Sequence, residues 1–523
     1  MKLYRAFATV GGLTLVSRVL GFARDILFAS LLGAGPVAEA FVVAFRFPNL
    51  FRRWFGEGAF NAAFVPLFAK RLEGEGRDEA RRFAGEAMSA LTLLLLVLTA
   101  AAILAMPALM LFLAPGFVGN PEKFELAVTM SRIAFPYIVC MSLVALLSGV
   151  LNSVGKFVES SAVSIVLNLT LMAAIGLAMA LGYGNNRNSG LVMASGVFAA
   201  GILQLWVLVD GVRRHGLMPP LRWPRLTDGV RQLVRLGVPG IIAGGVTQIN
   251  IVIGGMIASL QDGAVTWLYY ADRLYQLPLG IIGIAVGVVL LPDISRHLRA
   301  GDQVAVMDAQ NRSLEFAMLL TVPAAVALAV IPSEIIGILF ERGAFKTSDT
   351  ASVASALALF AIGLPAFVMI KVFSPAFFAR EDTTTPMRFA GLSLAVNTLG
   401  SIGLYFLFRH LGWSPHLGIA AATSFGGWLN AGLLYAALRR RGHFKSDARL
   451  SRALPMIGLA SAGLGLLLVF GADALAPWLT AKSLATRVAA LASLTVAGAL
   501  LYFALTALTG ALRLGGLGRA FKR

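Results

Sequence analysis

The chain has 523 residues, of which 58% are hydrophobic and only 13% are charged, and its mean hydropathy is +0.80. These values exclude a soluble globular protein and predict an integral membrane protein. The single cysteine, Cys140, excludes a disulfide framework and a cysteine-based metal cluster.

Fourteen apolar runs follow one another along the chain, each near the length of about 20 residues that crosses the hydrocarbon core. They are continuous and lack the ten-residue alternation typical of a transmembrane barrel, so we expect helices. The predicted fold is an all-α polytopic membrane protein. Its fourteen transmembrane helices are centred near residues 20, 52, 98, 138, 170, 201, 245, 280, 318, 360, 396, 427, 464 and 497.

Charged residues are concentrated in the first two segments, between Ser17 and Asn61. A charge at mid-membrane costs roughly 2.5–3.5 kcal/mol on insertion scales, and such residues usually face a cavity or a functional partner. Guanidinium groups pair bidentately with phosphate. We therefore predict a hydrated site for a pyrophosphate or another strongly acidic headgroup, lined by Arg18, Arg24, Arg52, Arg53 and, from a later segment, Arg273. Snorkelling from helix ends and a purely structural ion-pair network are the alternatives.

Three acids accompany these arginines, namely Glu39, Glu57 and Asp272. They either hold the arginines in place when the site is empty or exchange partners during a conformational change. Asp272 and Arg273 are adjacent, so on a helix their side chains point about 100° apart and do not simply neutralise each other.

The chain repeats itself at an offset of 227 residues, where Ala44-Phe45-Arg46 matches Ala271-Asp272-Arg273. Asn168 and Asn397 also occupy corresponding segments. The pattern predicts a six-helix lobe at 1–222, a second six-helix lobe at 223–445 and two added helices at 446–523. Six is an even number, so the two lobes form a parallel repeat with the substrate path expected between them. The added helices either form a groove for a lipid tail or only pad the second lobe.

Positive charge follows the predicted topology. Loops and termini on one side hold 29 of the 44 Lys and Arg residues, and the opposite loops hold 8. This bias predicts that both termini are cytoplasmic. It also explains the net charge of +18 without nucleic acid, because basic loops meet anionic lipid headgroups. The remaining seven lie within segments: Arg18, Arg24, Arg46, Arg52, Arg53, Arg273 and Lys371.

No enzyme signature is present. GVLNSVGKF at 149–157 departs from a phosphate-binding loop in its glycine spacing and in the residue after the lysine. The five histidines have no metal-ligand spacing, so we predict a transporter without a metal site or cofactor. Its energy would come from a gradient or the membrane potential. Asn250, Asp382 and Asn397 are weak candidates for a coupling-cation site, although Asp382 is first of all typical of a helix cap.

Several motifs closely resemble the MurJ (MviN) lipid II flippases, which belong to the multidrug/oligosaccharidyl-lipid/polysaccharide exporter superfamily. The resemblance covers nearly the whole chain. It is carried by SRVLGFARD at 17–25, FRFPNLFRRWFGEGAFNAAFVP at 45–66, YYADRLYQLPLGIIGIAVGVVLLP at 269–292, LFERGAF at 339–345 and AREDTTTP at 379–386.

The resemblance implies alternating-access transport of lipid II, an undecaprenyl-pyrophosphate-linked disaccharide-pentapeptide, across the bacterial cytoplasmic (inner) membrane for peptidoglycan synthesis. It also implies that the last two helices form a groove for the polyprenyl tail. Its functional positions correspond to Arg18, Arg24, Arg52, Arg53, Glu57, Asp272 and Arg273. Two positions depart from the family pattern: Glu39 stands where aspartate is common, and Gln276 replaces a carboxylate found in some relatives.

Lipid II and membrane lipids are thus the expected partners, and proteins of cell-wall synthesis or division are left open. The alternative is a polysaccharide-lipid or multidrug exporter of the same superfamily. A drug exporter favours an acidic or aromatic cavity, against which the basic cluster argues. A third possibility is a scaffold without transport activity, whose function would survive loss of the arginines.

Overall fold

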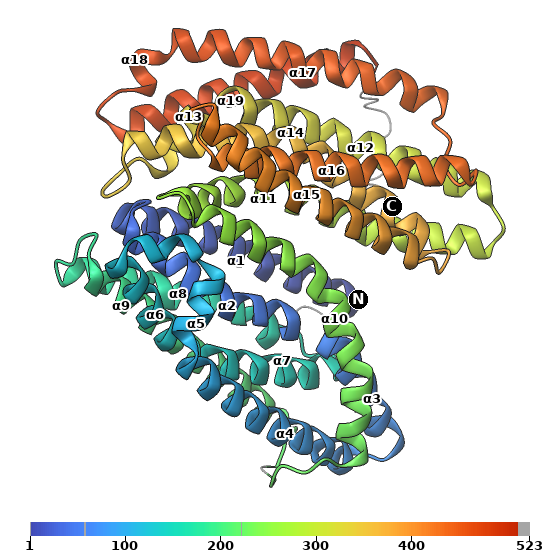
Figure 1. Ribbon diagram of the computed structural model, residues 1–523. Coiled ribbons are helices and arrows are strands. Elements are labelled where there is room, and N and C mark those ends of the chain that lie inside the picture. Colours follow the sequence, from blue (N-terminus) through green and yellow to red (C-terminus); the bar gives the residue numbers. More distant parts are fainter. Residues whose placement is uncertain (1, 57–58, 221, 511–523) are drawn as a thin grey trace. The chain divides into compact units, whose positions relative to one another are not determined.

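The computed structural model describes residues 2–56, 59–220 and 222–510, and in these ranges the only regular elements are helices (Figure 1). The side chains of 2–9, 47, 50–56, 59, 62, 239–249 and 284–289 are not described. The predicted helical class is confirmed. Each of the fourteen predicted centres falls inside a helix.

The chain divides into two compact units. Unit 1 comprises Met1–Thr266 together with Arg342–Lys346, and unit 2 comprises Trp267–Glu341 and Thr347–Arg523. This division groups residues by packing, whereas the predicted boundaries at 222 and 445 follow the internal repeat. The repeat-based division therefore stays a prediction.

Unit 1 contains ten α-helices and a 3-10 helix among its described residues. They are α1 (Lys2–Leu32), α2 (Pro36–Gly56), α3 (Ala59–Gly74), α4 (Arg77–Leu104), α5 (Met106–Leu113), η1 (Pro115–Gly119), α6 (Pro121–Ala134), α7 (Tyr137–Ser153), α8 (Val158–Ala180), α9 (Arg187–Arg214) and α10 (Asp228–Ala258). Helix α1 packs on α8, α2 packs on α6 and α7, and α10 packs on α3.

Unit 2 begins within α11 (Ala264–Arg299). It continues through α12 (Gln303–Val330), α13 (Pro332–Phe340), α14 (Thr347–Phe378), α15 (Thr384–His410), α16 (His416–Arg440), α17 (Ala448–Ala474), α18 (Ala476–Leu479) and α19 (Leu484–Leu508). Helix α16 packs on α14 and α15, while α12 packs on α14 and α17, and α17 packs on α19.

Ten helical stretches of the described chain are long and apolar enough to cross a membrane. They are Arg77–Leu104, Pro121–Ser153, Val158–Ala180, Arg187–Arg214, Gln303–Val330, Thr347–Phe378, Thr384–His410, His416–Arg440, Ala448–Ala474 and Leu484–Leu508. The predicted segments centred on 20, 52, 245 and 280 lie in α1, α2, α10 and α11, which are not among the ten. A total of fourteen spans therefore stays a prediction.

Apolar side chains lie both inside and outside the helical packing, as a lipid solvent permits. In unit 1, Phe64 stacks on Phe60 and Phe83 with ring centroids 5.6 and 5.7 Å apart. On α4, Leu94 and Val97 are 60% and 61% exposed. Exposed apolar side chains in such long runs need a hydrocarbon environment, which water would not provide.

Ion pairs fix the start of α17 to α12 in unit 2. The Arg312 guanidinium contacts Asp447 and Glu315, and Arg449 donates to Glu315 at 2.8 Å. Asn311 donates to the carbonyl oxygen of Lys445 at 2.9 Å. Helix α19 is also bonded to α12, because the Tyr502 hydroxyl donates to the carbonyl oxygen of Leu319 at 2.7 Å. Helices α17 and α19 are therefore both attached to α12 through polar contacts.

Candidate anion-binding site

Arg24 is buried in α1 and has partners on both sides of its guanidinium. Its Nε and Nη2 donate to Oδ1 of Asp25 at 3.1 and 2.6 Å. Its Nη1 donates to Oδ1 of Asn168 on α8 at 3.1 Å. The residue is 9% exposed and Asp25 is 3% exposed. The buried positive charge of Arg24 is thus next to the negative charge of Asp25.

Asn168 links Arg24 to the backbone of its own helix. Its Nδ2 donates to the carbonyl oxygen of Ser17 at 2.9 Å while its Oδ1 accepts from Arg24. Asn168 is itself buried. One amide therefore fixes both the direction of the Arg24 side chain and the packing of α8 on α1.

Arg18 differs from Arg24 although both lie on α1. Arg18 is partly buried and has no hydrogen bond or ion pair with any described residue. Six residues separate the two arginines, so they point about 120° apart and lie about 9 Å apart along the axis. Among the described residues the Arg18 guanidinium has no polar partner, whereas the Arg24 guanidinium donates to Asp25 and Asn168.

Three predicted residues are beyond a structural description. The backbones of Arg52 and Arg53 lie in the last turns of α2, but their side chains are not described. Glu57 lies outside the described residues. Their contribution to the site remains a prediction from the sequence.

Glu39, in the first turn of α2, pairs with Lys123 at the start of α6. The Lys123 ammonium contacts Oε2 of Glu39 and lies 2.9 Å from Oδ1 of Asp262. It also lies 4.2 Å from the ring centroid of Phe117. The side chains of Glu39 and Lys123 are each 1% exposed. This buried pair joins α2 and α6 to the turn between α10 and α11.

The partner of Glu39 therefore differs from the arginines with which the sequence associated it. Lys123 lies in GNPEKFE at 119–125, which reads as a polar separator between segments. Asn120 caps α6 by accepting from the backbone N–H of Lys123 at 3.1 Å, and this cap orients the first turn of the helix. The lysine is consequently buried rather than solvated, and only the three-dimensional packing reveals it.

In unit 2, the adjacent residues Asp272 and Arg273 each contact a residue one helical turn away on α11, in opposite directions along the helix. Asp272 accepts a hydrogen bond from Gln276 one turn further along α11. The Arg273 guanidinium carbon lies 4.7 Å above the ring of Tyr269. Gln276, which replaces an acid of some relatives, thus acts here as a hydrogen-bond donor to Asp272. A second carboxylate at that position would repel Asp272.

Arg273 belongs to unit 2, whereas Arg18 and Arg24 belong to unit 1. The structure therefore describes the two parts of the predicted cluster separately. Their convergence on one chamber remains a prediction.

Two of the three cation-site candidates, Asp382 and Asn397, do not share one site. Asp382 precedes α15 and accepts from Thr385 and Arg441, so it acts as a helix cap and an ion-pair partner. Asn397 lies about 20 Å further along α15 at the normal helical rise, too far for the two to share an ion. Asn250 lies on α10 in unit 1. No group of three or more His, Cys, Asp or Glu side chains suited to a metal occurs among the described residues.

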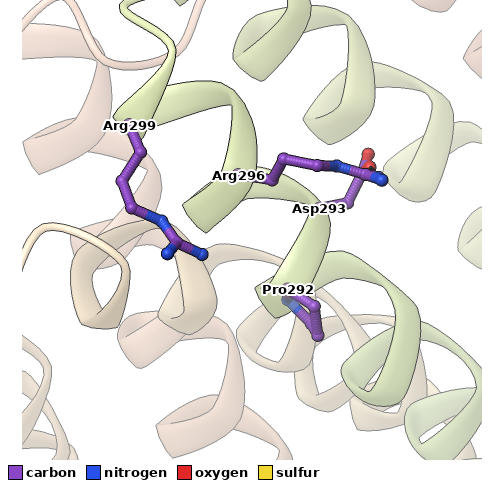
Figure 2. Close-up of a pocket in the computed structure, with 4 residues that line it drawn as sticks. All are labelled: Pro292, Asp293, Arg296 and Arg299. Carbon is purple, nitrogen blue, oxygen red and sulfur yellow. Dashed lines mark hydrogen bonds and ion pairs between the residues drawn. The ribbon is translucent and has the colours of Figure 1, made fainter.

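A surface pocket of about 320 Å³ lies at the end of α11, where it is lined by Pro292, Asp293, Arg296 and Arg299 (Figure 2). Arg296 is ion-paired to Asp293, and the ring Nε2 of His297 lies 3.6 Å from the same carboxylate. Basic residues are favourable in the last turn of a helix, where they face the negative end of its dipole. We therefore assign these residues to helix termination and not to the predicted arginine cluster.

Comparison with known proteins places these features in a family. A family model described as "Lipid II flippase MurJ" matches residues 28–505. A "Probable lipid II flippase MurJ" of Rhizobium tropici is 46% identical, and the alignment covers 100% of this chain and 97% of the relative. A "Lipid II flippase MurJ" of Burkholderia cenocepacia is 35% identical over 89% of this chain and 90% of its own.

Solved structures agree at the level of the fold. A structure of "Lipid II flippase MurJ, inward closed conformation" matches with a TM-score of 0.78 at 24% identity, covering 95% of this chain and 98% of that chain. An inward-facing multidrug resistance transporter of the MATE family matches with a TM-score of 0.64 at 15% identity, over 82% and 95% of the two chains.

Proposed function

Since the chain belongs to the MurJ family of lipid II flippases, which are transporters and not enzymes, we propose that it moves lipid II from the cytoplasmic to the outer leaflet of the bacterial cytoplasmic membrane. Lipid II here means the undecaprenyl-pyrophosphate-linked disaccharide-pentapeptide used to build peptidoglycan. The proposal extends to alternating access, in which the headgroup enters a cavity open to the cytoplasm and leaves after the cavity opens outward.

The difference between Arg18 and Arg24 on α1 is the observation that supports a diphosphate-binding site. Arg18 has no partner among the described residues, and Arg24 is held by Asp25 and Asn168. Arg18 thus brings to α1 a permanent positive charge that no described carboxylate pairs with, and a diphosphate would neutralise it. Each phosphate contact would also offset the cost of keeping a guanidinium away from bulk water.

We propose that Arg52, Arg53 and Arg273 complete the diphosphate site and that Glu57 and Asp272 exchange partners with these arginines. Glu39 would act in a different way. Its ion pair with Lys123 and the contact of Lys123 with Asp262 hold the turn between α10 and α11 against α2 and α6. The chain passes from unit 1 to unit 2 immediately after this turn. A movement of one unit relative to the other would therefore strain the ion pair between Glu39 and Lys123.

The proposed topology has fourteen spans with both termini in the cytoplasm, as the distribution of Lys and Arg predicts. Of the two roles left open for the last helices, we propose the groove for the polyprenyl tail, formed by α17 and α19, and not padding of the second lobe. They present exposed apolar side chains, including Phe470 at 68% and Leu500 at 68%. We propose no cofactor, and the energy source would be the membrane potential or a cation gradient.

Depletion with complementation tests the proposal. Loss of the protein should abolish exposure of lipid II on the outer leaflet, measured in intact cells by labelling or enzymatic cleavage of the exposed headgroup. Arg18→Ala and Arg273→Ala should fail to restore exposure although both reach the membrane. Arg187→Ala is the matched control, because its guanidinium pairs with Glu125 at an exposed position. Restoration of exposure by Arg18→Ala and Arg273→Ala would refute the proposed site and favour a scaffold without transport.

A polysaccharide-lipid or multidrug exporter of the same superfamily is the less well supported alternative. The likeness to a MATE transporter extends to the fold alone. The full-length relatives at 35–46% identity are named as lipid II flippases. A cavity with unbalanced guanidinium groups would also repel cationic drugs.

A further inference from the structure

Arg46 is a charged residue in the middle of α2 that the proposed site does not use. It is partly buried, and it has no hydrogen bond or ion pair with any described residue. The buried cations Arg24 and Lys123 of the same unit are each beside a carboxylate. An unpaired guanidinium within a membrane helix is costly unless it faces a cavity or binds an anion.

The neighbouring helix makes room for Arg46 at one glycine. A Cβ atom on Gly255 of α10 would overlap Nη1 of Arg46 and would lie 3.0 Å from its Nη2. The absence of a side chain at Gly255 therefore permits the guanidinium to lie against α10. Gly254, the adjacent residue, has open space at the same position and makes no such contact.

The acid on the same face of α2 is not available to Arg46. Glu39 precedes it by seven residues, which is close to two helical turns, so the two side chains point in nearly the same direction about 10 Å apart along the axis. The carboxylate of Glu39 is engaged by Lys123. The charge of Arg46 is thus uncompensated within the described part of the protein.

In the internal repeat, Arg46 corresponds in sequence to a residue of the proposed site. Ala44-Phe45-Arg46 matches Ala271-Asp272-Arg273 at the offset of 227 residues. The structure confirms that both arginines lie within long helices, α2 and α11. Arg273 has an aromatic neighbour, since its guanidinium lies over Tyr269, whereas Arg46 lies against a glycine. No described residue thus accepts a hydrogen bond from the donors of Arg46.

We propose that Arg46 is a further binding residue for the diphosphate of the transported lipid, and that Gly255 positions its guanidinium for that contact. This inference rests on the proposed function, because it assigns another contact to the same substrate. The guanidinium donates two parallel hydrogen bonds to phosphate oxygens, and a lysine at the same place would supply charge without the fork. Gly255 acts only through Arg46 and is a positioning residue.

Equilibrium binding of lipid II to the purified full-length protein in detergent micelles tests this inference. Arg46→Gln should weaken binding by about tenfold or more, since one charge-assisted contact is lost. Arg46→Lys should lie between Arg46→Gln and the unaltered protein. Gly255→Ala should weaken binding in the same direction although Arg46 is still present, because the flexible end of Arg46 has to move away from the added methyl group. Gly254→Ala is the matched control and should bind like the unaltered protein.

Two further measurements separate binding from folding and identify the part of the lipid that is recognised. Inorganic pyrophosphate should compete with lipid II, and its competition constant should rise in Arg46→Gln and Gly255→Ala by the same factor as the lipid II constant. Thermal unfolding in the absence of ligand should be similar for Gly255→Ala and Gly254→Ala. Unchanged affinity in both Arg46→Gln and Gly255→Ala, or a loss of thermal stability in Arg46→Gln without a loss of affinity, would overturn the role of Arg46.

The two proposals fail in different ways. If the unaltered protein does not bind lipid II, the proposed function fails and the assignment of Arg46 fails with it. If the unaltered protein binds lipid II and Arg18→Ala weakens that binding while Arg46→Gln and Gly255→Ala do not, only the assignment of Arg46 is wrong. Weaker lipid II binding without any change in pyrophosphate competition would also contradict it, since the contact would then be to another part of the lipid.

Discussion

Ala344 donates its backbone N–H to the carbonyl oxygen of Ser30 at 2.9 Å, and this bond places residues 342–346 on the end of α1. Two glycines with positive φ permit the approach, Gly33 at 61° and Gly343 at 59°. A Cβ atom on Gly33 would overlap the carbonyl oxygen of Ala344, and one on Gly343 would overlap that of Ser30. Each backbone therefore requires a glycine in the other. This contact explains why position 343, in the LFERGAF motif at 339–345, is a glycine.

Alanine at either glycine should destabilise the protein more than alanine at a glycine that has only an unusual φ. Gly412 supplies that control, since its φ is 74° and nothing lies near its missing Cβ. All three substitutions share a backbone cost of about 1–2 kcal/mol, and the overlap with a carbonyl adds to it at Gly33 and Gly343. The measurement is the midpoint of thermal unfolding in detergent. Equal losses in Gly343→Ala and Gly412→Ala would show that the contact is not required.

The ion pair of Lys123 with Glu39 should be sensitive to removal of one partner. Lys123→Ala would leave a carboxylate that is 1% exposed without its counter-ion, and such losses cost about 3–5 kcal/mol. The double variant Lys123→Met, Glu39→Gln removes both charges and should regain most of the stability. Arg187→Ala breaks an exposed pair with Glu125 and should cost no more than about 1 kcal/mol. A double variant as unstable as Lys123→Ala would contradict this account.

The helical architecture could be predicted from the sequence because it depends on long apolar runs, which reflect the bilayer directly. The centre predicted at 464, for example, falls within α17 and the one at 497 within α19. Short interruptions were not predictable in the same way. Helices α5 and α6 occur between the predicted centres at 98 and 138, since each begins with a proline at or near its first position.

The partners of the charged residues could be predicted only in part. Asp25 follows Arg24 directly, but neighbours on a helix normally point about 100° apart, so their contact depends on the conformation of a long side chain. Asn168 was singled out by the repeat, without any sign that it meets Arg24. Lys123 was hidden in a polar stretch. In each case the missing information is which helices pack together, and hydrophobic periodicity does not contain it.

Asn168 should matter for the position of Arg24 and for the packing of α1. Asn168→Ala removes the acceptor of Arg24 and the donor to Ser17, both inside the protein. We expect a loss of about 1–3 kcal/mol in stability together with weaker lipid II binding. The control is Gln204→Ala, which removes a buried hydrogen bond from Nε2 of Gln204 to the carbonyl oxygen of Val163, at 2.7 Å, with no arginine involved.

Both variants should lower the unfolding temperature, but only Asn168→Ala should also lower the affinity for lipid II. Because the guanidinium of Arg24 would then lack its Asn168 acceptor but keep its full charge, the lost affinity should be partly recovered at low ionic strength, where charge attraction is less screened. If Gln204→Ala reduced binding as much as Asn168→Ala, the effect of Asn168 would be one of general stability.

Asp382 should make the protein less stable in acid. Hydrogen bonds from Thr385, followed by the Arg441 guanidinium, lower the pKa of this carboxyl well below its usual range. In the unfolded chain the same carboxyl takes up a proton below about pH 4. The folded protein therefore binds fewer protons than the unfolded chain in that range. The stabilisation is fully present above pH 4 and is lost as the pH falls towards the folded pKa.

Asp382→Asn isolates this contribution. The amide can still cap Thr385 but carries no charge for Arg441, so the variant should be less stable than the unaltered protein at pH 7, by no more than about 1 kcal/mol for a partly exposed pair. The difference should shrink between about pH 4 and pH 3, measured as unfolding midpoints in detergent. Burial also lowers the pKa of the nearby His443, but this histidine is present in both proteins being compared. A difference that stays constant from pH 7 to pH 3 would show that the charge of Asp382 does not contribute.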